Sequence, residues 1–371
     1  MNDEDNNILI NEEKNINNKS NNNISFVFDI FSQYHSLDDA NSGNYLDNQF
    51  DVFNSLNNEN ILIYIRNKGD NKSIVCYNID TCQKVYSINN ISKSKIKCIK
   101  HYILDKRDIF IICSYDNTIQ FFDLYIGIKF FEIKNAFVKK SKKYKNFCIN
   151  SFCLFFKEKN IFLISEEFYD KNLTIWEISK NSKNYEIKNI EKINDITNIY
   201  YLDIYSYYDD NEKKNINLII TCGYKTNIKF LDFETKSIYK EYNTKKYDCR
   251  SVKIGGINKK YVICNKENGL IIFDFYSTQL VNYFDFNFIS NSGIIYNNRY
   301  FFFTVENLIR IIDLNDFTLN KLSFCFNISD YMKKEKITDL KIINNQKNEN
   351  LLFLHNYPYI LFFEFFIDIK K

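Results

Sequence analysis

The chain has 371 residues, of which 45% are hydrophobic and 17% aromatic, which is enough apolar material for a large core. Its formal net charge of +3 excludes the strongly basic character of proteins that bind nucleic acids through bulk charge. The 10 cysteines form no CxxC pair, which favours buried apolar thiols in a reducing compartment over disulfides or a metal centre.

The first residues of the chain are polar and acidic. Residues 1–22 are rich in Asn, Asp, Glu and Lys, and we predict a disordered tail there, because so few apolar side chains cannot offset the entropy cost of ordering. This segment carries no signal-peptide pattern, so we expect a cytoplasmic protein, with the nucleus as the alternative.

The next segment, residues 24–31, alternates like a strand and has no neighbouring strand to pair with. We predict that it pairs with the last strands of the chain and closes their sheet. The alternative is a free-standing anchor peptide. Residues 32–45 are polar, and we interpret them as a linker.

A strand–turn–strand pattern then recurs along the chain, and residues 113–124 show it most clearly. An apolar strand leads to a polar turn, and a second apolar strand ends about six residues later on a hydrophobic residue followed by a polar one. The terminal pairs are Tyr77-Asn78, Phe122-Asp123, Trp176-Glu177, Leu231-Asp232, Phe273-Asp274, Ile312-Asp313 and Phe363-Glu364.

Strand-only repeats of about 40–50 residues are typical of propellers. The sequence therefore predicts an all-β fold, a single seven-bladed β-propeller over residues 23–371, with four-stranded antiparallel blades and a ring closed by the N-terminal strand. The blades are expected within about 46–368, at 46–90, 95–134, 147–188, 196–242, 248–286, 290–325 and 336–368. Residues 135–146, 186–194 and 207–215 are interpreted as insertions.

The repeat resembles the WD repeat. The resemblance rests on Ser114, Asp116, Thr118 and Phe122-Asp123-Leu124, and on the similar stretches 173–178 and 228–233. The chain departs from the family pattern because Trp176 is its only tryptophan and it has no Gly-His pair. The family's hydrogen-bond network is thus incomplete, and we expect apolar packing to stabilise the blades. The resemblance implies membership in a larger assembly.

Two groups of surface residues are candidates for binding. Turn residues are expected to lie around one face of the propeller and to contact partner proteins, because loop tips on a rigid scaffold commonly bind. They are Tyr115, Tyr169, Lys225, Glu267, Glu306 and Tyr357. The insertion at 135–146 has a cluster of lysines that could bind phosphate, although a solvated loop has the same composition. These are Lys139, Lys140, Lys142, Lys143 and Lys145.

The sequence predicts no catalytic, cofactor-binding or metal-binding residues. His35, His101 and His355 are far apart, without the spacing of zinc ligands or of a catalytic triad, and we expect structural roles for them. The carboxylates of the terminal pairs are also expected to be structural, because each comes at the end of a strand.

The function that these features favour is a non-catalytic scaffold that docks proteins or peptides within a larger intracellular assembly. One alternative is a propeller that binds phosphoinositide or another phosphate through the lysine-rich loop, which would bring it to a membrane surface. The other is an enzyme built on a propeller. We expect proteins or peptides as partners, no nucleic acid and no transmembrane segment.

Overall fold

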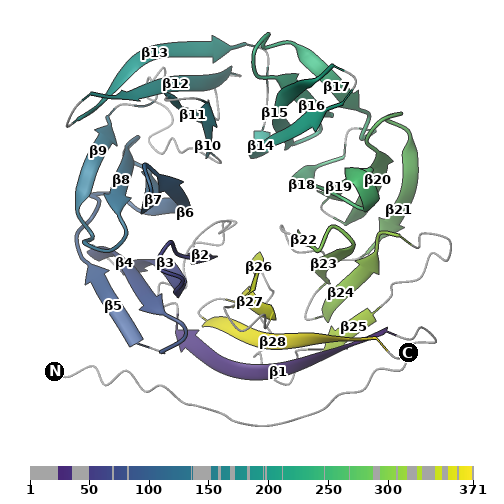
Figure 1. Ribbon diagram of the computed structural model, residues 1–371, viewed down its shortest axis with the longest axis horizontal. Helices are drawn as coiled ribbons and strands as arrows, with labels where there is room; N and C mark the ends of the chain where they lie inside the picture. The colour runs from purple at the N-terminus through teal and green to yellow at the C-terminus, as the bar shows by residue number, and fades with distance from the viewer. Residues whose placement is uncertain are drawn as a thin grey trace. The chain divides into compact units, whose positions relative to one another are not determined.

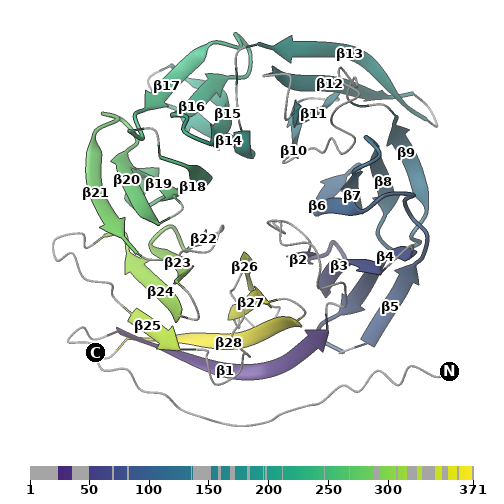
Figure 2. The ribbon, with the colours of Figure 1, turned by 180° about the vertical axis from the view of Figure 1, so that it is seen from behind.

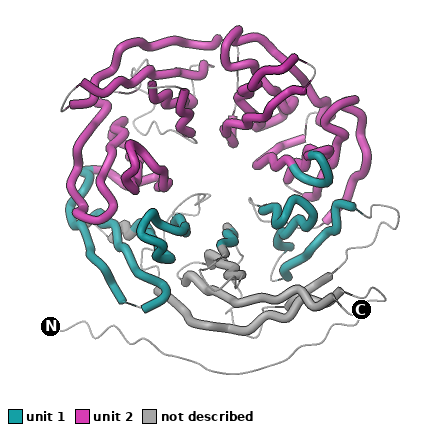
Figure 3. The backbone as a smooth tube through the Cα atoms, viewed as in Figure 1, with its two compact units in different colours: residues 1–93, 255–258, 287–371 teal, residues 94–254, 259–286 magenta. Residues whose placement is uncertain are grey.

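The computed structural model describes residues 24–35, 50–68, 71–81, 83–134, 136, 152–157, 160–167, 172–181, 184–194, 196, 199–210, 212–245, 247–266, 268–286, 293–305, 308–315, 324–327, 339–344, 350–356 and 359–369. These residues form a β-propeller arrangement of mostly four-stranded antiparallel blades. Two compact units can be distinguished (Figure 3), residues 1–93, 255–258 and 287–371 in unit 1 and residues 94–254 and 259–286 in unit 2.

Unit 2 contains sheets that are each built from four consecutive strands. They are β6 (Ile96–Leu104), β7 (Arg107–Ser114), β8 (Ile119–Asp123) and β9 (Lys129–Ile133); β10 (Phe152–Lys157), β11 (Asn160–Glu167), β12 (Asn172–Lys180) and β13 (Tyr185–Ile193); β14 (Ile199–Asp209), β15 (Lys214–Gly223), β16 (Ile228–Asp232) and β17 (Ile238–Tyr242); and β18 (Cys249–Gly255), β19 (Tyr261–Lys266), β20 (Gly269–Asp274) and β21 (Leu280–Asp285). Within this unit the sheets follow one another in chain order, with their first strands on one side and their fourth strands on the other (Figures 1 and 2).

Unit 1 contains two further sheets of consecutive strands, and one sheet that joins the two ends of the described chain. The first two are β2 (Phe50–Asn54), β3 (Asn60–Lys68), β4 (Asn71–Asn78) and β5 (Gln83–Ile88), and β22 (Gly293–Tyr296), β23 (Tyr300–Val305), β24 (Leu308–Asp313) and β25 (Phe324–Asn327). In the third sheet, β1 (Ile24–His35) pairs antiparallel with β28 (Tyr359–Ile369), which is followed by β27 (Asn350–Asn356) and β26 (Asp339–Asn344). The strand predicted at 24–31 is therefore present, and its partner is β28, the last strand among the described residues. β1 continues to His35, so residues 32–35 are strand and not part of the linker that we expected at 32–45.

The turn between the third and fourth strands of a sheet is organised by one carboxylate. Asp274 ends β20, and its Oδ1 accepts hydrogen bonds from the backbone N–H groups of Tyr276 (3.0 Å) and Ser277 (2.8 Å). Phe275, which lies between them, is 2% exposed, and its N–H donates to the carbonyl of Lys260 at 2.6 Å. The turn is thus fixed both internally and to the start of the second strand.

The same turn recurs in other sheets. Asp123 and Asp232 each accept the equivalent two backbone hydrogen bonds, and Asp313 accepts one from the N–H of Asn315 at 2.9 Å. A residue with positive φ follows in three of these turns, at Gly127 (65°), Lys236 (60°) and Thr278 (61°). The aspartates of the repeat therefore have the structural role expected from their place in the sequence.

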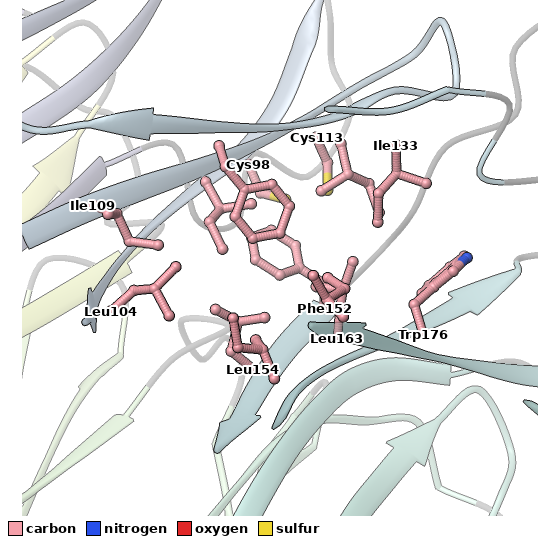
Figure 4. Packing of buried hydrophobic residues seen from close by; sticks show 14 residues of the cluster. Cys98, Leu104, Ile109, Cys113, Ile133, Phe152, Leu154, Leu163 and Trp176 are labelled. Atoms are coloured by element: carbon pink, nitrogen blue, oxygen red, sulfur yellow. The ribbon is translucent and has the colours of Figure 1, made fainter. Parts of the chain in front are cut away.

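The core of unit 2 lies between neighbouring sheets. Figure 4 shows one cluster, in which Cys98 and Ile109 of the β6–β9 sheet pack with Phe152, Leu163 and Trp176 of the β10–β13 sheet. Trp176 is 2% exposed and Phe152 is 0% exposed. Further clusters join β10–β13 to β14–β17 and β14–β17 to β18–β21. Apolar packing between sheets therefore connects these repeats, as the missing WD-type network led us to expect.

Two of the segments that we interpreted as insertions are strands. Residues 186–194 lie almost entirely in β13, and residues 207–215 belong to the hairpin of β14 and β15. We did not recognise β13 from the sequence because it is the exposed fourth strand of its sheet. A bulge at Glu177/Ile178 also shifts the register of its pairing with β12. Polar residues therefore interrupt its apolar alternation without preventing strand pairing.

Candidate binding surface

The structure describes two of the predicted binding residues. Tyr115 is half-buried in the turn between β7 and β8, and its N–H donates to the carbonyl of Lys95 at 3.0 Å. Lys225 is exposed in the turn between β15 and β16. The sheet of β10–β13 comes between their two sheets in chain order. Outside the described residues lie Tyr169, Glu267, Glu306 and Tyr357, as well as Lys139, Lys140, Lys142, Lys143 and Lys145.

Lys225 lies within an exposed aromatic surface, which we call the turn-end surface: Tyr200, Tyr224, Lys225 and Tyr247. The tyrosines are 38%, 39% and 39% exposed, in that order. The rings of Tyr200 and Tyr224 are 6.4 Å apart, and the Lys225 ammonium is 4.9 Å from the centre of the Tyr224 ring. These residues come from the start of β14, the turn after β15 and the loop before β18, so two sheets contribute to the surface.

The backbone under this surface is fixed by polar contacts. Lys225 has φ 52°, and its N–H donates to Oδ1 of Asp248 at 3.1 Å. Thr244 in the loop before β18 donates through Oγ1 to the carbonyl of Thr226 at 3.0 Å. The turn of one sheet is thus bonded to the loop that enters the next sheet. The Lys225 side chain therefore projects from a rigid support rather than from a mobile tip.

A buried lysine extends the surface into the sheet of β18–β21. Lys266 has a side chain that is 5% exposed, and its ammonium donates to Asp285 at 2.7 Å and to the hydroxyl of Tyr283. The same ammonium lies 4.4 Å from the ring centre of Tyr247 and 4.1 Å from that of Tyr283. The charge of Lys266 is therefore compensated internally, and its role is to position the two tyrosines.

The pKa shifts at this surface favour binding over proton transfer. Interaction with Tyr224 raises the pKa of Lys225, and the hydrogen bond from Lys266 lowers the pKa of Asp285. Burial, followed by the contact with Asp285, raises the pKa of Tyr283. The pKa of each of these groups moves further from neutral pH, whereas a general acid or base works best when its pKa is near the working pH. The chemistry available here is therefore aromatic contact, hydrogen bonding and a positive charge.

Other polar groups suspected from the sequence have structural surroundings. His101 Nε2 lies 2.8 Å from Oδ1 of Asp108, and these side chains are 10% and 0% exposed, which links β6 to β7 inside their sheet. Oε1 of Glu177 accepts a hydrogen bond from Nδ2 of Asn160 at 2.9 Å. No group of three or more His, Cys, Asp or Glu with the arrangement of a metal site occurs in the part of the chain that the structure describes.

The sequence prediction included Lys225 but not the tyrosines around it. Tyr224 directly precedes Lys225, so this neighbour could have been noticed as part of the turn. Tyr200 lies inside the predicted fourth blade, and Tyr247 lies in the connection between the fourth and fifth blades. Tyr200 lies near Tyr224 because β14 pairs with β15, and the hydrogen bond from Lys225 to Asp248 brings the segment of Tyr247 to this turn. No local pattern in the sequence reports these tertiary contacts.

Comparisons with family models and with curated proteins give no relative on which to base a function. Among the described residues, no helix is long and apolar enough to cross a lipid bilayer. No family model matches the chain, and no curated protein matches it either.

Proposed function

We propose that this protein is a non-catalytic scaffold that docks partner proteins or peptides through the turn-end surface. As the architecture behind this role, we propose a WD-repeat-like propeller of seven blades. Six sheets of four consecutive strands, together with the sheet of β1 and β26–β28, support that number. The recurring aspartate-capped turn supports the repeat relationship.

The observation that carries the proposal is the combination of exposed tyrosines and an exposed lysine on a rigid turn. Tyrosine offers a large amphipathic contact area at a low cost in conformational entropy, and it is enriched at binding hot spots. Tyr224 and Lys225 are supported by the Asp248 and Thr244 hydrogen bonds, so less order has to be gained on binding.

A double variant tests this proposal. Tyr224→Ala combined with Lys225→Glu removes an aromatic contact and reverses the charge without changing a buried side chain. The control is Ile103→Ala combined with Lys106→Glu, which alters an exposed apolar residue (47% exposed) and an exposed lysine with φ 59° in the turn between β6 and β7. Tagged full-length proteins are purified from the native cell, and co-purifying proteins are quantified by mass spectrometry.

We expect the turn-end variant to lose a reproducible set of partners by about tenfold or more, equivalent to about 1.4 kcal/mol of binding free energy. The control should retain them. Identical partner sets for the wild type and the turn-end variant would refute docking at this surface.

A further inference from the structure

The opposite end of the β14–β17 and β18–β21 sheets has a second, denser group of tyrosines. We call it the tyrosine surface: Tyr205, Tyr207, Tyr239, Lys240 and Tyr276. Tyr205 and Tyr207 come from β14, Tyr239 and Lys240 from β17, and Tyr276 from the turn between β20 and β21. Tyr239 is 37% exposed and Tyr276 is 62% exposed.

A buried aromatic residue supports this surface from below. The ring of Phe275 is 5.9 Å from the rings of both Tyr205 and Tyr207, and it meets them edge to face at 71° and 89°. The hydroxyls of Tyr207 and Tyr239 are 2.9 Å apart and share a hydrogen bond. Two sheets therefore meet through one continuous aromatic cluster, whose geometry is fixed before any partner arrives.

Lys240 fixes the turn that presents Tyr276. Its ammonium donates hydrogen bonds to the carbonyls of Phe275 (2.9 Å) and Tyr276 (3.1 Å), and it lies 4.8 Å from the centre of the Phe275 ring. The Asp274 cap constrains the same turn from within. Tyr276 is the most exposed tyrosine of the cluster. These hydrogen bonds nevertheless hold its backbone in place, as expected of a preorganised anchor.

One side of the tyrosine surface, at Lys259 and Lys260, is positively charged, whereas Asp209 lies near Tyr207 on the β14 side. Lys259 and Lys260 are both exposed, and the Lys259 ammonium lies 5.2 Å from the centre of the Tyr205 ring. Asp274 is close enough for Lys260 to influence its pKa, but its Oδ1 is already used to cap the turn. Neither lysine forms an ion pair with a carboxylate within the described ranges, so both charges are available to a ligand.

We propose that the tyrosine surface binds an acidic, extended segment of a partner protein. Carboxylates of that segment would pair with Lys259 and Lys260, and its apolar side chains would pack on Tyr276 and Tyr239. Complementary charge and aromatic anchors together give both the orientation and the affinity of such a contact. This site goes beyond the docking surface around Lys225, because it lies at the other end of the same two sheets and would allow the protein to bridge two partners.

The test uses short fluorescein-labelled peptides of repeated Glu-Leu-Pro units, with Gln-Leu-Pro and Lys-Leu-Pro peptides as charge controls. Binding to the full-length protein is measured by fluorescence anisotropy at low and high ionic strength. The variants are Tyr276→Ala and Lys259→Glu/Lys260→Glu. The matched control is Tyr125→Ala, because Tyr125 follows Asp123-Leu124 as Tyr276 follows Asp274-Phe275, and it is 38% exposed.

We expect only the Glu peptide to bind the wild-type protein, and we expect its dissociation constant to rise with salt. The dissociation constant should rise about tenfold or more in both tyrosine-surface variants and stay unchanged in Tyr125→Ala. Thermal unfolding of each variant shows whether the fold is retained. Binding of the Gln peptide as tightly as the Glu peptide, or no effect of either variant, would overturn the proposal. So would preferential binding of anionic vesicles or of single-stranded RNA at these residues. Variants of the turn-end surface should not alter this binding, which separates the two docking proposals.

Discussion

Single side chains determine the shape of the turns in this protein. Asp123, Asp232 and Asp274 each accept two backbone hydrogen bonds from the residues two and three positions later. Each cap satisfies donors that would otherwise depend on water, and it lets the intervening residue be buried. A polar residue at the end of a strand could be read from the sequence, and so could its structural role.

Thr278 is strained in its turn, and replacing it should stabilise the protein. It has φ 61°, a conformation that is costly for a β-branched residue, whereas Gly127 occupies the equivalent position at φ 65°. We expect Thr278→Gly to raise the free energy of unfolding by about 1 kcal/mol, measured by urea denaturation. The reciprocal change, Gly127→Thr, should lower it. A loss of stability in Thr278→Gly would contradict this account of the turn.

The Asp274 cap predicts how stability depends on pH. Burial opposes ionisation of Asp274, but the hydrogen bonds from Ser277 and Tyr276 outweigh it and lower the pKa of the carboxyl group. Because the folded-state pKa lies below the unfolded one, this stabilisation is present above about pH 4 and is lost as the pH falls through the folded-state pKa.

Asp274→Asn keeps an oxygen that accepts hydrogen bonds, but its side chain cannot ionise. Asn78 shows that an amide can fill this position, because its side-chain oxygen accepts a hydrogen bond from the N–H of Thr81 at 3.1 Å. The difference in unfolding free energy between the wild type and Asp274→Asn should therefore be largest near neutral pH and shrink towards zero in acid. A difference that stays constant from neutral pH to pH values below the folded-state pKa would contradict the role given to the charge.

At the scale of elements, the most important contacts are those between neighbouring sheets. The second strands are buried along almost their whole length, as in β7, where the residues after Arg107 are all buried. The third strands are nearly as apolar, and the fourth strands are largely exposed, as in β13. Neighbouring sheets therefore cover both faces of the central strands, which explains their continuous hydrophobic sequence.

Trp176 offers a direct probe of one such contact. It is 2% exposed in the cluster between β6–β9 and β10–β13, and it is the only tryptophan of the chain. We expect Trp176→Phe to cost about 1–2 kcal/mol of unfolding free energy and Trp176→Ala about 3–5 kcal/mol, because the larger deletion leaves a cavity.

Circular dichroism in urea measures both variants, and the tryptophan emission of the wild type reports the same contact. The emission should shift to longer wavelength in the same transition that removes the strand signal. A native emission maximum typical of a water-exposed indole would contradict the buried position of Trp176.

The sequence allowed the elements to be predicted where the chemistry is local. The strand before each turn and the aspartates of the terminal pairs follow from residue type and spacing. The assignment of residues 186–194 as an insertion was wrong, because an outer strand needs no apolar face. The aromatic surfaces could not be predicted, since Tyr205 and Tyr276 come together only through packing between sheets.

At the scale of the whole molecule, the two ends of the described chain share one sheet. β1 pairs with β28 in a register that places Ser25 opposite Asp368 and Phe26 opposite Ile367, with an irregularity between Ile30 and Ser32. Without β1, the 11-residue strand β28 would have a free edge that invites aggregation. β1 therefore completes the sheet of β26–β28.

Cysteine cross-linking of these two strands is the most direct test of that claim. Two variants each place a pair of cysteines at opposed positions of β1 and β28: Ser25→Cys/Asp368→Cys and Phe26→Cys/Ile367→Cys. Both are made because adjacent pairs in an antiparallel ladder alternate in the distance between their side chains. The control is Ser25→Cys/Ile360→Cys, because Ile360 lies opposite Tyr34 instead.

The disulfides formed under mild oxidation are identified by mass spectrometry of the full-length proteins. We predict a high-yield cross-link in at least one of the two opposed pairs, a higher unfolding temperature for that cross-linked protein, and no cross-link in the control. Equal cross-linking of the control, or none in either opposed pair, would show that the first strand does not belong to the last sheet.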